Sequence, residues 1–138
     1  MLGQVYSPED ALAFIQYMIP FFKDQRYIKV EGRPVLFVYR PSAMEHVEDY
    51  MRIWREECER NDLPAPYVVA TLTRGAVSPA HYGMDAAVER VLHDWTGGAV
   101  ADIRHELNPY GPINGSVLDY SEVADHYMHK QLDNDYVL

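Results

Sequence analysis

Two short apolar runs separated by one amphipathic segment constrain the fold of this 138-residue chain more than any other feature. The runs cover residues 34–39 and 67–72, and both are rich in β-branched and aromatic residues. Neither alternates between apolar and polar positions, which favours strands buried on both faces, as in parallel sheets. Between the runs, apolar residues recur at helical spacing from Val47 to Cys58. Residues 34–72 are therefore predicted to form one β-α-β unit with a right-handed crossover.

Local signals predict where two helices begin and end. A serine precedes Pro8, and proline suits the first position of a helix, so the first helix is expected to start at Pro8. Pro20 is expected to kink or end that helix, because proline lacks the backbone N–H that the helix interior requires. Ser42 and Glu45 have the spacing of a capping box, which predicts a second helix that runs to about Arg60.

The second half of the chain has weaker patterns. Residues 73–84 are predicted to form a loop, and residues 85–89 a short strand. Residues 99–116 are rich in proline, asparagine and glycine, which favours an extended surface loop. Ser121 is expected to cap a last helix that ends near Leu132. The predicted fold is α/β, with parallel strands and flanking helices in a single domain over residues 1–138.

Composition and charge exclude several classes of function. The chain is 48% hydrophobic and 24% charged, which is typical of one globular domain. Its net charge is −9 and its twelve Lys and Arg residues are scattered, so nucleic acid is not an expected partner. It lacks an apolar run of about 18 residues and the pattern of a signal peptide. We therefore expect no membrane span, and the sequence predicts a cytoplasmic protein.

Tyr39 and Arg40 are the first candidate site residues, because they end an otherwise apolar strand. In alternating β/α folds, polar groups at the carboxyl ends of buried strands reach the ligand. The planar guanidinium of Arg40 suits a phosphate, a carboxylate or a pair of sugar hydroxyls. It could equally pair with a neighbouring carboxylate, and the sequence leaves both interpretations open.

Asp85 and Glu89 are the most suggestive carboxylates. On one strand they share a face about 13 Å apart, at ~3.3 Å per residue. That separation exceeds the ~5–9.5 Å of paired glycosidase carboxylates, so they do not form an acid and base couple by themselves. In the alternative interpretation, Asp85 caps a turn and Glu89 is exposed to solvent at the end of a strand. His93 follows Glu89 closely and could share a pocket with it.

The sequence predicts neither a metal site nor a cofactor. The single cysteine, Cys58, lies on the apolar stripe of a predicted helix and is expected to be buried and unreactive. His126 and His129 have i, i+3 spacing, but no further ligand completes a zinc set. The chain also has no Walker loop, dinucleotide-binding glycine motif or nucleophile elbow.

Three segments together resemble the WbsX-type glycosyltransferase family, which is related to the family 99 glycoside hydrolases, the endo-α-mannosidases. They are FFKDQRYIKVEGRPVLFVYRP (21–41), WREECERNDLPAPYVVA (54–70) and GMDAAVERVLH (83–93). The resemblance covers roughly residues 4–128. It implies a (β/α)8 TIM barrel acting on carbohydrate, typically in bacterial surface polysaccharide biosynthesis. It also implies a carbohydrate or nucleotide-sugar ligand, with substrate-binding residues Tyr39, Arg40, Asp85, Glu89 and His93.

The chain departs from this family in two respects. The family usually has an aromatic residue and a proline between the glutamate and the histidine, whereas residues 90–92 here are Arg-Val-Leu. A complete barrel takes about 250 residues, and the family's upstream tryptophan-rich motif and downstream W-N-E-W-type motif are both missing. The resemblance therefore implies a central fragment of a TIM barrel that lacks part of the catalytic set. The alternative is a non-catalytic carbohydrate-binding or assembly module, in which open sheet edges drive homo-oligomerisation or pairing with a partner chain that completes the barrel.

Overall fold

The computed structural model describes residues 6–72, 78–89, 98–106, 111 and 115–129. The chain divides into two compact units, residues 1–89 with 134–138, and residues 90–133. The elements of the first unit are, in chain order, α1 (Pro8–Lys23), β1 (Lys29–Val30), β2 (Arg33–Val38), the short 3-10 helix η1 (Pro41–Ala43), α2 (Val47–Arg60), β3 (Tyr67–Leu72), the 3-10 helix η2 (Pro79–Tyr82) and β4 (Ala86–Glu89).

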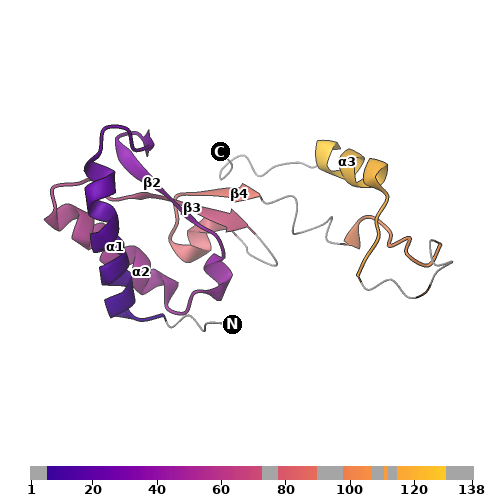
Figure 1. The fold of residues 1–138 in the computed structure, drawn as a ribbon, viewed down its shortest axis with the longest axis horizontal. Coiled ribbons are helices and arrows are strands. Elements are labelled where there is room, and N and C mark those ends of the chain that lie inside the picture. The colour runs from indigo at the N-terminus through magenta and orange to yellow at the C-terminus, as the bar shows by residue number, and fades with distance from the viewer. Residues whose placement is uncertain (1–5, 73–77, 90–97, 107–110, 112–114, 130–138) are drawn as a thin grey trace. The chain divides into compact units, whose positions relative to one another are not determined.

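The strands of the first unit form one sheet in the order β1-β2-β3-β4 (Figure 1). β1 runs antiparallel to β2, whereas β2, β3 and β4 are parallel to one another. Val38 lies opposite Ala70, and Leu72 lies opposite Glu89. The carboxyl ends of the three parallel strands therefore lie together along one side of the sheet, which we call its carboxyl edge. The predicted β-α-β unit is confirmed as β2, α2 and β3.

The core lies between the sheet and the two long helices, α1 and α2, which pack side by side (Figure 1). Because side chains alternate along a strand, each strand gives one set of residues to this core and the next set to the other face. The helix-facing core contains Ile15, Phe22, Leu36, Val38, Met51, Trp54, Cys58, Val68, Ala70 and Ala87. A second, smaller cluster contains Val35, Val69 and Ala86.

Of the helix boundaries predicted in the first unit, the start at Pro8 is confirmed and the capping box at Ser42 is wrong. Pro20, which was expected to kink or end the first helix, does not end α1, which continues to Lys23. Ser42 does not cap α2, because it lies inside η1 and the chain at Met44 is extended (φ −86°, ψ 116°). The helix begins only after His46, which has left-handed backbone geometry (φ 54°). The end of α2 at Arg60 agrees with the sequence prediction.

The second unit contains the isolated β-bridge Asp102–Leu118 and the helix α3 (Tyr120–His129). Asp119, rather than Ser121, caps α3, because its Oδ1 accepts hydrogen bonds from the backbone N–H groups of Ser121 (2.8 Å) and Glu122 (3.2 Å). The protein is thus a mixed α/β chain with an open sheet, parallel strands and flanking helices.

Candidate functional site

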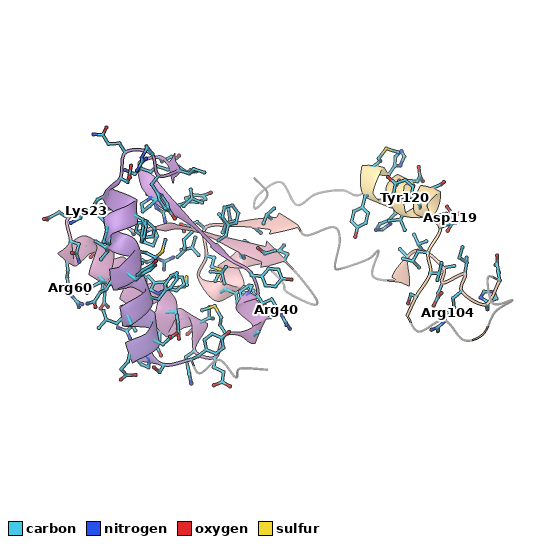
Figure 2. The ribbon with its side chains drawn as sticks, in the orientation of Figure 1. Lys23, Arg40, Arg60, Arg104, Asp119 and Tyr120 are labelled. Carbon is cyan, nitrogen blue, oxygen red and sulfur yellow. The ribbon has the colours of Figure 1, made fainter. Side chains whose placement is uncertain are left out.

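A surface pocket of about 460 Å³ lies at the carboxyl end of β2, and we call it the β2-end pocket. It includes Tyr39 and Arg40, the two residues that directly follow this strand. Figure 2 shows Arg40 at the margin of the first unit, beside η1. The described lining residues are Tyr6, Asp10, Phe14, Phe37, Val38, Tyr39, Arg40, Ala43, Met44, Tyr50 and Trp54.

The chain direction after β2 explains why Tyr39 and Arg40 reach the surface. Val38 is buried in the helix-facing core, and Pro41 is buried at the start of η1. The two residues between these anchors are exposed, with Tyr39 49% accessible. Because η1 begins at Pro41, the chain leaves the sheet after Val38 and presents both side chains at the carboxyl end of β2.

Aromatic rings form most of the pocket wall. Phe14 and Trp54 lie with their ring centroids 5.2 Å apart, and Tyr50 lies edge-on to Trp54 at 5.8 Å. The indole N–H of Trp54 donates to the carbonyl oxygen of Ala11 (3.1 Å), which fixes the ring between α1 and α2. Phe37 is 60% exposed and leaves an apolar ring open to solvent. Such rings offer flat apolar faces beside polar edges, a combination that suits a sugar ring.

Asp10 supplies a carboxylate to the same pocket. The hydroxyl of Tyr50 donates to its Oδ2 (2.8 Å) and accepts from the backbone N–H of Ser7 (3.1 Å). Tyr50 is buried, and burial together with the hydrogen bond to Asp10 raises its pKa to about 12, so it stays protonated and remains a donor at neutral pH. This chain of hydrogen bonds ties the first turn of α1 to α2 and holds the Asp10 carboxylate in place.

Asp85 lies at the other end of the sheet. It directly precedes β4, and its Oδ1 accepts from the guanidinium of Arg33 at 2.7 Å. Its Oδ2 accepts from the backbone N–H of Val68 at 2.9 Å. Arg33 also donates to the carbonyl oxygens of Ala65 and Pro66. These bonds join the amino ends of three strands, so the structure does not bring Asp85 together with Tyr39 and Arg40.

Glu89 and His93 are the remaining residues predicted to bind substrate. Glu89 is the last residue of β4, so its backbone lies at the same edge of the sheet as the end of β2. β4 is two strands from β2, or roughly 10 Å at ~4.8 Å per strand. His93 lies outside the described residues.

The described part of the chain carries neither a metal cluster nor a membrane-spanning helix. There, no group of three or more His, Cys, Asp or Glu side chains could hold a metal ion. No helix among these residues is long and apolar enough to cross a membrane. Cys58 is fully buried, and burial raises the pKa of its thiol to about 11, so the sequence prediction of a buried cysteine is confirmed.

A larger pocket, of about 790 Å³, lies in the second unit. Most of its lining is apolar, including Val100, Val117 and Leu118. Its carboxylate, Asp102, already accepts from the backbone N–H groups of Arg104 and Val117. The β2-end pocket is therefore the better candidate site, because it combines aromatic rings with charged groups that remain accessible.

Comparison with known families shows which family the chain belongs to. The family described as glycosyltransferase WbsX matches residues 1–138, which is the whole chain. The chain belongs to the WbsX glycosyltransferase family. Its resemblance to that family is thus confirmed, and membership supports a carbohydrate-active protein.

Two curated relatives are much longer than this chain. Two proteins from different strains of Xanthomonas campestris pv. campestris, both named "Uncharacterized protein WxcX", are 30% and 29% identical to it over 138 residues. The matches cover 100% of this chain but 19% of each relative, so the chain spans about a fifth of their length. No solved structure matches the chain.

Sequence reasoning missed the contribution of the helices to the pocket. Tyr50 and Trp54 were predicted to be part of the inner stripe of α2, and they are buried there, but one edge of each also lines the pocket. Asp10 lies in the first turn of α1, where a negative charge is favourable by itself, so the sequence alone gives no reason to place it in a pocket. A usable signal was the pairing of an acidic first turn in α1 with a tyrosine on the buried stripe of α2, since a buried hydroxyl requires a hydrogen-bond partner.

Proposed function

We propose that this chain belongs to a carbohydrate-active (β/α)8 domain and holds a sugar in the β2-end pocket. Membership of the WbsX family supports action on carbohydrate. The parallel order of β2, β3 and β4, with helices against one face, supports a barrel segment. The greater length of the relatives supports the proposal that a complete domain needs more chain than this. In this proposal the domain is related to family 99 glycoside hydrolases and acts in surface polysaccharide biosynthesis.

The proposed role of Tyr39 and Arg40 is to position the sugar. Arg40 donates hydrogen bonds from a planar fork, and Tyr39 offers a half-exposed ring in the pocket that Phe37 also lines. The observation that carries the proposal is that these groups share one pocket at the carboxyl end of a parallel strand, where ligands bind in β/α folds.

Glycosyl transfer or hydrolysis also needs a carboxylic acid beside the reacting bond. Such an acid protonates or deprotonates the glycosidic oxygen as oxocarbenium character develops on the sugar. Glu89 is retained as a proposed substrate-binding residue because its backbone lies at the same edge as the end of β2, and His93 is retained with it. Asp85 is left out because both of its oxygens are already hydrogen-bonded at the opposite edge.

Fluorescence can test sugar binding, because Trp54 lines the pocket. The chain has two tryptophans, so the variant Trp95→Phe leaves Trp54 as the single indole emitter. Titration with a panel of soluble oligosaccharides should change this emission for at least one of them. Arg40→Ala or Tyr39→Ala should weaken that response by roughly tenfold, the loss expected from one or two hydrogen bonds or one stacked ring.

The matched control is Arg26→Ala, because Arg26 is an exposed arginine of the same unit whose guanidinium pairs with Asp24. This variant should leave the affinity unchanged. Binding that survives both pocket substitutions, or that is lost equally in the control, would contradict a sugar site at this position.

A non-catalytic assembly module is the second candidate function. β1 pairs only with the first two residues of β2. Among the described residues, Phe37 and Val38 therefore have no strand beside them on the side of β2 that faces away from β3. An open edge of this kind can pair with another chain. Sedimentation velocity across a hundredfold concentration range tests this candidate: a concentration-dependent dimer supports it, and a monomer throughout argues against it.

A further inference from the structure

The charges of the β2-end pocket indicate which class of carbohydrate it accepts. Its described lining residues include one carboxylate, Asp10, and one guanidinium, Arg40, and no lysine. The described lining therefore carries opposite charges that sum to about zero. A site for a nucleoside diphosphate usually combines several cations, a free helix N-terminus or a bound Mg²⁺.

None of these features of a diphosphate site occurs in the described part of this pocket. The amino end of α1 carries the carboxylates of Glu9 and Asp10 in its first turn, and the Ser7 side chain accepts from the Asp10 N–H. A diphosphate in this pocket would share it with the Asp10 carboxylate, and like charges repel. The described residues also include no cluster that could hold a divalent metal.

The Asp10 carboxylate has an oxygen available to accept hydrogen bonds from sugar hydroxyls. Its Oδ2 accepts from the Tyr50 hydroxyl at 2.8 Å, while no donor to Oδ1 occurs among the described residues. Asp10 itself is exposed, so Oδ1 can accept from a ligand. An ionised carboxylate has about four lone-pair sites, so one donor from Tyr50 leaves room for two hydroxyl donors. Tyr50 thus acts as the positioning residue for Asp10.

Arg40 supplies the complementary donors. Every other arginine of the first unit in the described chain has a protein partner: Arg26, Arg33, Arg52 and Arg60 pair with carboxylates, and Arg55 donates to the carbonyl oxygen of Gly83. Within the same described residues, Arg40 makes no ion pair. Its guanidinium is exposed at the pocket and can donate to hydroxyl or ring oxygens.

We infer that the β2-end pocket takes an uncharged sugar ring with adjacent hydroxyls, and not the diphosphate of a nucleotide sugar. Asp10 accepts from the hydroxyls, Arg40 donates to oxygens of the same ring, and Phe37 and Tyr39 contact its apolar face. This inference rests on the proposed function and deepens it, because it assigns the pocket to the saccharide rather than to an activated donor. A volume of about 460 Å³ lies within the size range of small-molecule sites.

The test compares neutral and charged probes in the Trp95→Phe background. The neutral probes are the methyl glycosides of glucose, galactose and mannose, and the charged probes are UDP, GDP and galacturonic acid. We expect Trp54 emission to respond to at least one neutral glycoside, and each nucleotide to bind at least about tenfold more weakly, the effect of one unpaired charge. Asp10→Asn should weaken the affinity for the neutral glycoside by about tenfold or more, because the amide replaces an acceptor with a donor.

Tyr50→Phe serves as a second variant that leaves the Asp10 charge intact. The substitution removes the hydrogen bond that holds the Asp10 carboxylate. We expect it to weaken the affinity for the neutral glycoside by about three- to tenfold, the loss of one positioning hydrogen bond. Arg26→Gln is the control and should change nothing. Far-UV circular dichroism of each variant confirms that the affinity is compared between folded chains.

The outcomes separate this inference from the proposed function. Nucleotide binding that depends on Arg40 but not on Asp10, without binding of neutral glycosides, would overturn the inference and leave a carbohydrate-active protein in place. A preference for galacturonic acid over the neutral probes would also overturn it. If no neutral sugar, acidic sugar or nucleotide changes Trp54 emission, both the inference and the proposed sugar site are wrong.

Discussion

Replacing Asp85 by alanine should lower the free energy of unfolding by about 2–4 kcal/mol. The substitution removes two hydrogen bonds to a carboxylate, from Arg33 (2.7 Å) and from the Val68 N–H (2.9 Å). Hydrogen bonds to charged groups contribute about 1.5–3 kcal/mol each. The side chains of Arg33 and Asp85 are 27% and 20% exposed, so solvent compensates for part of the loss. Arg33 also keeps its bonds to the Ala65 and Pro66 carbonyl oxygens, which limits the effect.

Urea unfolding followed by far-UV circular dichroism measures this loss. The matched control is Asp24→Ala, which breaks the pair with Arg26, an arginine whose side chain is 90% exposed. Exposed pairs contribute about 0–1 kcal/mol, so the control should change stability far less. A double-mutant cycle with Arg33→Met, which keeps the apolar stem of the arginine, should give a coupling energy of about 1–2 kcal/mol.

The refuting result is a loss below about 0.5 kcal/mol for Asp85→Ala, which is typical of surface substitutions away from such contacts. It would mean that this ion pair does not join the amino ends of the strands, and Asp85 would again be a candidate to bind substrate. Sugar affinity provides a second criterion. Asp85→Asn should leave it unchanged, because the residue lies at the opposite edge of the sheet from the β2-end pocket.

Three further predictions address local features of the first unit. Cys58 is fully buried with a raised pKa, so Ellman's reagent should modify it at least about a hundredfold more slowly in the native protein than in urea, and rapid native labelling would contradict its burial. The pKa of Tyr50 is about 12 in the folded protein and about 10 when unfolded. Its contribution to stability is therefore complete below pH ~10 and lost toward pH ~12, and Tyr50→Phe should remove that part of the alkaline loss in pH-dependent urea titrations. Gly32 has a φ of 79° and follows Glu31 at 51° in the β1–β2 turn, so Gly32→Ala should cost about 1 kcal/mol, whereas Glu31→Asn should be neutral or stabilising in the same assay.

Periodicity was sufficient to predict the central part of the fold. The runs at 34–39 and 67–72 became β2 and β3, and the stripe between them became α2. These elements are predictable because a buried strand and an amphipathic helix each leave a pattern within a few adjacent residues. The start of α2 was not predictable from its capping signal. Ser42 has a serine's usual cap chemistry, but the η1 turn and the extended Met44 place it before the helix.

The candidate site was predicted only where it depends on one strand. Tyr39 and Arg40 follow β2 directly, so the pattern of that strand was enough to find them. Asp10 was missed because it joins the pocket through a hydrogen bond to Tyr50, forty positions along the chain. The family resemblance implies that Asp85 and Glu89 both bind substrate, but the four residues from Asp85 to Glu89 run in extended conformation, so their backbones lie at opposite ends of β4.

The sequence by itself therefore determined the β-α-β unit, the buried faces of its helices and strands, and the exposed pair at the end of β2. These features depend on the period of apolar residues and on proline, both of which act locally. Only the tertiary structure decided which charges meet. The packing of α1 against α2 brings Asp10 to Tyr50 and to the same pocket as Arg40, and the parallel pairing of β2, β3 and β4 brings Asp85 to Arg33. The physical reason is that a charge finds its partner through distances in space, which the sequence pattern of a single segment does not contain.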